Sequence, residues 1–168
     1  MTLTLPAPAA PALEEQDRFE RIVTDYETMG LSVGWHLLAI LRPQLPADTR
    51  TARELGELPS GTQVCVAGMV TARQRPGTAK GIVFLLLEDD TGMTNVIVYP
   101  DCYERHRTLL RAEPLVVVHG RLERRDRNIN VIAERIARIA PPADRTSEEA
   151  ARARQAVPAG QHFGRGRR

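Results

Sequence analysis

The feature that most constrains the fold is a series of five β-rich segments with one helical segment between the third and the fourth. Short turns separate the segments, which cover residues 63–75, 82–89, 94–100, 114–125 and 128–136. Runs of this length that are rich in Val and Ile and bounded by Gly, Pro, Asn or Asp are typical of strands. After the third run, Pro100 and Asp101 begin a helical pattern with one apolar stripe, formed by Tyr103, His106, Leu109 and Leu110.

The order β-β-β-α-β-β is the plan of the OB-fold, a small five-stranded Greek-key barrel. The segments 63–75, 82–89 and 114–125 are apolar on nearly both faces. This pattern predicts that one face of each strand lines the barrel and that a helical layer covers the other. We therefore expect a mainly β protein with α extensions, whose OB-fold domain spans residues 61–140.

The barrel should be preceded by a small helical segment, residues 14–60, that packs on it. A helix over 16–29 has one apolar face and ends at Gly30. Ser32 can cap a second, short helix that ends at Arg42-Pro43, and Thr51 and Glu54 have capping-box spacing for a third. Ahead of these, residues 1–13 lack the basic start of a signal peptide, and prolines interrupt them, so we expect a flexible leader.

Residues 141–168 contain six arginines and three acidic residues. Residues 146–156 can form a helix, whereas the ending QHFGRGRR favours disorder. We expect an Arg-rich, largely disordered tail.

Composition adds less. Of the 23 Lys and Arg residues only Lys80 is lysine, which suits phosphate contacts but also fits the codon bias of a GC-rich genome. Cys65 and Cys102 have no neighbouring ligands and are expected to be reduced thiols in a cytoplasmic protein. No apolar run is long enough to cross a membrane.

Two stretches carry a family resemblance. Residues 25–45 read DYETMGLSVGWHLLAILRPQL, and residues 73–105 read RQRPGTAKGIVFLLLEDDTGMTNVIVYPDCYER. Over residues 20–139 the chain resembles the C-terminal region of the bacterial error-prone DNA polymerases, relatives of the replicative polymerase alpha subunit. Leu37 and Leu86 depart from that pattern, which has proline and threonine there.

The resemblance implies a nucleic-acid-binding module that serves damage-tolerant DNA synthesis. The palm domain with its metal-binding carboxylates has no counterpart in the sequence, so we expect no enzymatic activity from this chain alone. The resemblance leaves open whether the chain is a stand-alone protein, a truncated gene product or a fragment.

OB-folds grip ligands with strands two and three and with the loops after strands one and four. The candidate nucleic-acid-binding residues are therefore Arg73, Arg75 and Lys80 in the first loop, Tyr99 at the end of strand three, and Arg121, Arg124, Arg125, Arg127 and Asn128 around the second loop. These basic groups can follow a phosphate backbone. They can equally be solvated hairpin tips or a docking surface for a polymerase core.

Other polar or aromatic residues have simpler interpretations. Phe84 lies in an unbroken apolar run and is expected in the core. Glu88, Asp89 and Asp90 lead into a turn, where an aspartate has a local structural role. The four histidines lack ligand spacing, so the sequence predicts no catalytic residue, metal or cofactor.

Two functions remain in competition. The first is binding of single-stranded DNA or a primer-template, with weak sequence preference because aromatic residues make up only 4% of the chain. The second is a protein-docking domain that joins a polymerase core to a mutagenesis accessory protein. An RNA-binding OB module, as in aminoacyl-tRNA synthetases, is disfavoured by the run Arg-Gln-Arg-Pro-Gly-Thr-Ala.

Overall fold

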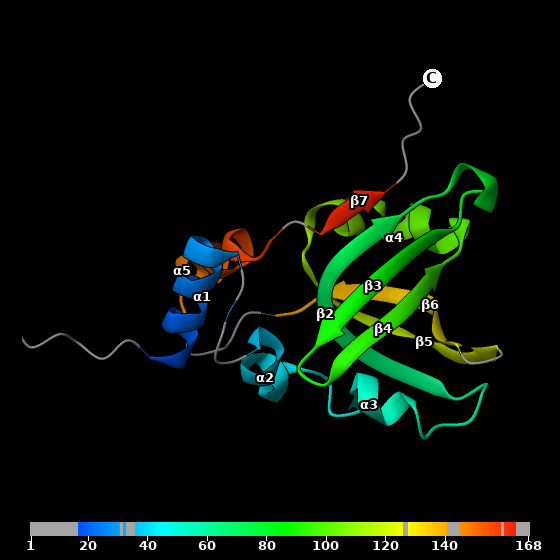
Figure 1. Ribbon diagram of the computed structural model, residues 1–168, viewed down its shortest axis with the longest axis horizontal. Helices are drawn as coiled ribbons and strands as arrows, with labels where there is room; N and C mark the ends of the chain where they lie inside the picture. Colours follow the sequence, from blue (N-terminus) through cyan, green and yellow to red (C-terminus); the bar gives the residue numbers. More distant parts are fainter. Residues whose placement is uncertain are drawn as a thin grey trace, which may run out of the picture.

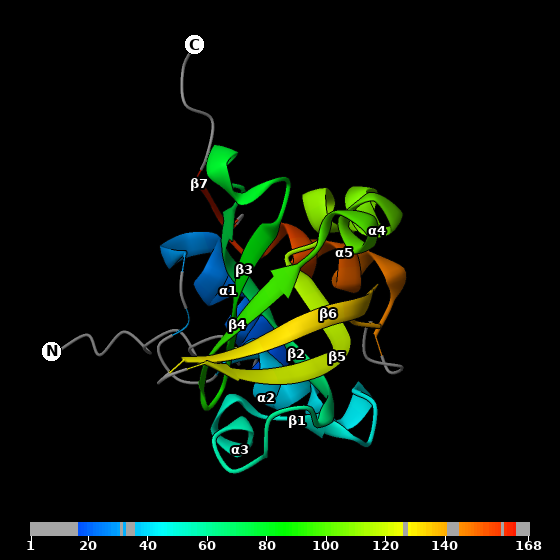
Figure 2. The same cartoon turned by 90° about the vertical axis from the view of Figure 1, so that its right-hand side faces the viewer.

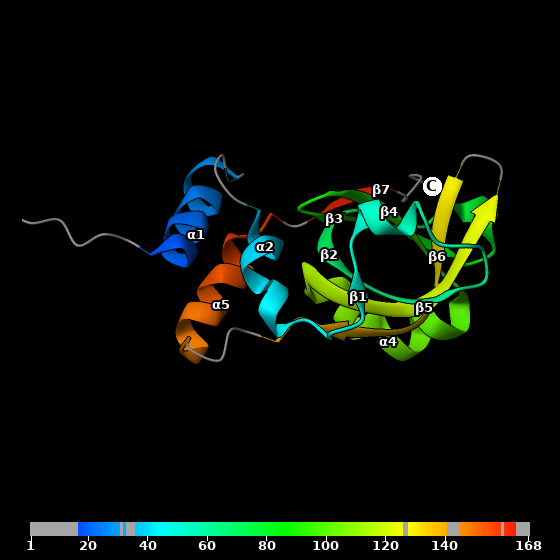
Figure 3. The ribbon, with the colours of Figure 1, turned by 90° about the horizontal axis from the view of Figure 1, so that it is seen from below.

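The computed structural model describes residues 17–30, 32, 36–125, 128–140, 145–158 and 160–163. A barrel lies beside a group of three helices (Figures 1 and 3). The barrel strands are β2 (Gln63–Gln74), β3 (Val83–Asp89), β4 (Gly92–Val98), β5 (Leu115–Arg125) and β6 (Asn128–Arg138), and α4 (Pro100–Ala112) stands between β4 and β5. The expected element order is therefore confirmed.

The five strands close into a ring. β2, β3 and β4 form an antiparallel meander, β4 pairs in parallel with β6, and β5 pairs antiparallel with both β6 and β2. This ring is the OB-fold barrel that the sequence predicts. Figure 2 shows β6 and β5 crossing in front of the strongly curved β2.

Alternation along the strands separates two cores. The barrel interior holds one side of each strand, including Val66, Val70, Leu85, Val96 and Val118. The opposite side of β2 and β5 belongs to a second cluster with the helices, including Cys65, Ala67, Met69, Leu115 and Val117. Because successive side chains of a strand point to opposite faces, β2 and β5 are buried on both sides.

The helical group consists of α1 (Arg18–Met29), α2 (Leu37–Leu41) and α5 (Ser147–Ala156). α1 begins at the cap Asp17 and ends at Gly30, whose φ of 71° requires the left-handed conformation that glycine adopts easily. The predicted helix over 16–29 and its glycine stop are thus confirmed.

Shorter elements connect this group to the barrel and extend its sheet. They are η1 (Arg42–Gln44), β1 (Thr49–Arg50), α3 (Ala52–Leu55), η2 (Gly77–Ala79) and β7 (Gln161–Phe163). The capping box of Thr51 and Glu54 is present at α3, as expected. β1 and β7 each pair in parallel with β2.

The predicted cap of the second helix is wrong. His36 caps α2, because its Nδ1 accepts a hydrogen bond from the backbone N–H of Leu38 at 3.1 Å. The hydroxyl of Ser32 instead donates to a carboxylate oxygen of Asp25. The α-helix ends at Leu41, before Arg42-Pro43 as expected, and the chain continues as the 3-10 turn η1, since proline is tolerated in a first helical turn.

The expectation of a largely disordered tail is wrong for its described part. α5 confirms the helix predicted over 146–156, and ion pairs of Arg145 with Asp17 and of Arg152 with Glu27 join it to α1. β7 then adds three residues of the ending to the sheet. The leader, residues 1–13, lies outside the described residues, and no described helix is long and apolar enough to cross a membrane.

Candidate nucleic-acid interface

The outward side chains of β3, β4 and β6 are exposed or half-buried, so no described helix covers the middle of this outer face. Register places Phe84, Ile97 and Ile132 side by side in one row across these strands. A second row contains Leu86, Asn95 and Asn130. Neighbours in such a row have Cβ atoms roughly 5 Å apart, so the two rows form one continuous surface. We call this surface the open face.

Phe84 corrects one expectation, because it is not a core residue. Its burial pattern alternates with that of Val83 and Leu85, and 36% of Phe84 is exposed. Tyr99 follows Ile97 by two residues and is 48% exposed. A helical layer was also expected over residues 82–89, and β3 lacks it. The open face thus presents two aromatic rings, the groups on which unpaired bases stack.

Basic residues flank the Phe84 end of the open face. Gln74 and Phe84 form the last pair of the β2–β3 ladder, and the loop that follows Gln74 holds Arg75 and Lys80. The guanidinium of Arg75 lies over the ring of Tyr103 in α4, 4.8 Å from its centroid. Lys80 is exposed and has a left-handed φ of 48°.

The β5–β6 hairpin supplies the other border. Arg121 is paired with Ile132, and Arg125 with Asn128, so all of these lie on the outer side of the barrel together with the two rows. Arg121, Arg125 and Asn128 are exposed. Arg127 lies outside the described residues.

Two of the predicted basic residues lie away from the open face. Arg73 belongs to β2 rather than to a loop and is 9% exposed, with its Nη2 donating to the carbonyl of Glu113 at 2.7 Å. Arg124 alternates with Arg125 and turns to the end of the barrel. There its guanidinium donates to the backbone carbonyls of Leu55, Gly56 and Leu58 after α3.

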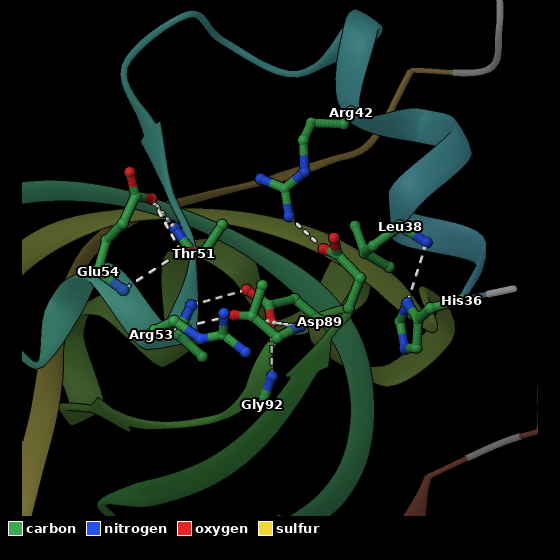
Figure 4. A network of polar contacts seen from close by, with 11 residues as sticks. His36, Leu38, Arg42, Thr51, Arg53, Glu54, Asp89 and Gly92 are labelled. Carbon is green, nitrogen blue, oxygen red and sulfur yellow. Dashed lines mark hydrogen bonds and ion pairs between the residues drawn. The ribbon is translucent and has the colours of Figure 1, made fainter.

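The acidic run at the β3–β4 turn has the structural role that the sequence predicts. Asp89 is buried, and its carboxylate accepts hydrogen bonds from the backbone N–H groups of Thr91, Gly92 and Ala52. Its neighbour Asp90 pairs with Arg42 of η1 (Figure 4). The turn is thereby tied to the helical segment at both carboxylates.

Three possible metal ligands that are distant in the sequence lie close together in the structure. Side-chain ligand atoms of Asp48, Cys65 and His119 lie within 4.8 Å of one another, and Cys65 and His119 are direct cross-strand neighbours. Two features oppose metal binding there. Burial raises the pKa of the Cys65 thiol, and a guanidinium nitrogen of Arg135 lies 3.0 Å from Nε2 of His119.

Residues that the sequence analysis missed are Phe84, Leu86, Asn95, Ile97, Asn130 and Ile132, all on the open face. The two-residue period of a strand could have identified them, since Phe84, Leu86 and Glu88 share one side of β3. Because the run is apolar at nearly every position, this period is not visible in the sequence.

The family model for the OB-fold nucleic acid binding domain, tRNA_anti-codon, matches residues 64–139. The chain thus contains an OB-fold domain that matches this family of nucleic-acid-binding domains over residues 64–139. It is also 48% identical over 139 residues to the error-prone DNA polymerase of Anaeromyxobacter dehalogenans (strain 2CP-C), and 45% identical over 123 residues to that of Pseudomonas fluorescens (strain Pf0-1). The resemblance to error-prone DNA polymerases is thus confirmed.

These matches cover 82% and 73% of this chain but only 12% of each relative. The chain therefore corresponds to a small part of the polymerases. Among solved structures, asparaginyl-tRNA synthetase from Pyrococcus horikoshii is 22% identical over 67% of this chain and 29% of its own, with a TM-score of 0.48.

Proposed function

We propose that the OB-fold domain binds single-stranded DNA or the single-stranded part of a primer-template on its open face, in the service of damage-tolerant DNA synthesis. The observation that carries the proposal is the arrangement of the face itself. Exposed Phe84 and Tyr99 lie among apolar and amide side chains, with Arg75 and Lys80 at one border and Arg121 and Arg125 at the other.

The arrangement matches what an unpaired strand requires. Bases need flat apolar platforms, and each base stacked on an aromatic ring contributes roughly 1–3 kcal/mol. Phosphates need positive charge along the path of the backbone. Asn95 and Asn130 add amide donors and acceptors between the rings and the hairpin. Two rings give little means of reading a base sequence, so specificity should be weak.

The link to damage tolerance is supported by the relatives, which are named error-prone DNA polymerases. The described part of the chain consists of an OB-fold barrel with a helical group, an architecture that supports a role in binding. We infer that this chain alone does not extend a primer.

A protein-docking function is the second candidate. Leu86, Ile97 and the 58% exposed Met93 would suit an apolar partner such as a polymerase core or a mutagenesis accessory protein. The charged borders favour DNA.

The test is fluorescence anisotropy with a labelled oligo-dT. The double variant F84A/Y99A should lose about thirtyfold or more in affinity, because two stacking platforms worth roughly 1–3 kcal/mol each are removed. The control is Met29→Ala, which removes a 53% exposed side chain from α1 and should leave affinity unchanged. Equal affinities of F84A/Y99A and the parent would move the site off this face and favour protein docking.

Salt dependence separates the ring contacts from the charge contacts. If Arg75, Lys80, Arg121 and Arg125 each neutralise one phosphate, the slope of log K against log salt should be about −3. The variant R121A/R125A should reduce it by about half. Equal affinities for oligo-dT and for an oligo-rU of the same length would indicate that the domain does not distinguish deoxyribose from ribose.

A further inference from the structure

A second concentration of positive charge lies at the junction of β2, α4 and α5. Arg73, Arg111 and Arg154 line a groove of about 350 Å³ together with Glu113 and Gln155. Arg111 lies in the last turn of α4 and Arg154 in the last turn of α5. Three elements that are distant in sequence therefore direct arginines to one place.

Arg73 is the unusual member, because its side chain is more than nine-tenths buried. Its Nη2 donates to the carbonyl of Glu113, but its Nε has no hydrogen-bond partner among the described residues. Burial lowers the pKa of this guanidinium. Buried charges are ordinarily paired, since an unpaired one has lost its hydration without gaining a partner.

Local structure accounts for only part of this charge. Cations near a helix C-terminus are favourable, and each such terminus supplies roughly half a negative charge. Two C-termini and the carboxylate of Glu113 therefore leave a net charge of roughly +1 beside the three guanidinium groups. In the described part of the chain none of the three arginines forms an ion pair.

We propose that this groove is an anion site for a phosphate group, carried by a free diphosphate or nucleotide or by a nucleic-acid strand. Arginine is the side chain best suited to phosphate oxygens, because its planar fork donates two parallel hydrogen bonds. A volume of about 350 Å³ is in the range of small-molecule sites, so a diphosphate fits as well as a single phosphate.

The site differs from the open face. Arg111 and Arg154 belong to α4 and α5, whereas the rows of the open face lie on β3, β4 and β6. Loss of either site should therefore leave the other intact.

The experiment is calorimetric titration of the full chain with inorganic pyrophosphate at low salt. The parent should bind saturably with one site. The variant R111A/R154A, which changes side chains at the groove rim, should bind at least about tenfold more weakly, since charge-assisted contacts are lost. The control R105A/R107A removes two exposed arginines of α4 outside the groove and should bind like the parent.

A second arm identifies the source of the phosphate. If the ligand is a free diphosphate, R111A/R154A should bind oligo-dT like the control. If the ligand is a strand, its oligo-dT affinity should fall and pyrophosphate should compete with the oligonucleotide. Arg73→Gln, checked for folding by circular dichroism, should also weaken pyrophosphate binding.

The proposal is overturned if the parent shows no saturable binding of pyrophosphate, or if R111A/R154A and R105A/R107A bind both ligands equally. F84A/Y99A should retain pyrophosphate binding, so failure of this site and failure of the open face give different results.

Discussion

The two outer sides of the barrel are built from the same kind of strand, but helices cover one side and leave the other open. On β2 and β5 the outward residues Cys65, Ala67, Met69 and Val117 are apolar and lie beneath the helical group. On β3, β4 and β6 the outward positions mix Phe84 and Ile97 with amides and charges and stay open. The contrast is visible within β5 alone, where Leu115 and Val117 are covered and Arg121 is exposed.

The helical group covers only the apolar part of the outer surface of the barrel. The helices end where the outward side chains of β5 become polar, between Val117 and His119. Burial of the apolar outward positions stabilises the helical group, which is too small to hold a core of its own. The remaining outer surface is left free for a ligand.

A charge placed on the covered side and on the open side should have very different effects on stability. Val117→Glu should cost about 3–5 kcal/mol of unfolding free energy, because Val117 is 5% exposed and the new carboxylate would lose its hydration there. Phe84→Glu, on the open face, should cost under about 1 kcal/mol. Urea unfolding monitored by circular dichroism measures both. Similar losses at the two positions would show that the open face is also packed.

Two neighbouring arginines of the β5–β6 hairpin should also differ in their contribution to stability. Arg124→Ala should cost about 2 kcal/mol, because its guanidinium donates at 2.8 Å to Leu58 and also to the carbonyls of Leu55 and Gly56. Arg125→Ala should change stability by under about 0.5 kcal/mol and instead weaken oligo-dT binding. Unfolding free energies and anisotropy titrations of both variants provide the measurements. The reverse pattern would reassign Arg124 to the ligand.

Much of the fold could be predicted from sequence because its signals are local. The β-β-β-α-β-β order, the glycine stop of α1 and the capping box at Thr51 are all written in short stretches. The cap of α2 escaped because histidine is an uncommon N-cap beside an ordinary Ser32. β7 was not predicted because Gln161–Phe163 is too short to show a strand pattern. Its strand conformation depends on pairing with the edge of β2.

The candidate site was harder, because side-chain direction depends on register. Arg73 and Arg75 look equivalent in a basic loop, yet β2 extends to Gln74 and buries Arg73. Arg124 and Arg125 look equivalent in a basic hairpin, yet alternation sends them to different sides. The charge of each segment could be read from the sequence, but the partner of each arginine could not.

The smallest expected effect concerns the polar joint between the two regions, at the cap of α2. Burial lowers the pKa of His36, and this outweighs the nearby Glu88, Asp89 and Asp90, which raise it, while Arg42 lowers it further. In addition, Nδ1 must be unprotonated to accept the hydrogen bond from Leu38 (Figure 4).

As the pH falls through the unfolded-state pKa of about 6.5, the unfolded chain therefore takes up a proton at His36 before the folded chain does. Stability from this residue is complete above that pH and is lost below it. Between pH 7.5 and 5.5 the unfolding free energy of the parent should fall more than that of His36→Asn, since asparagine caps a helix equally well and does not titrate. Urea unfolding at a series of pH values measures the difference.

Carboxylates with lowered pKa, such as Asp17 and Glu54, titrate at lower pH in both proteins and serve as the internal reference. Parallel stability curves for parent and variant over this interval would show that α2 does not depend on a neutral His36, and that the joint between helices and barrel is held by the Arg42–Asp90 pair and the Asp89 turn instead.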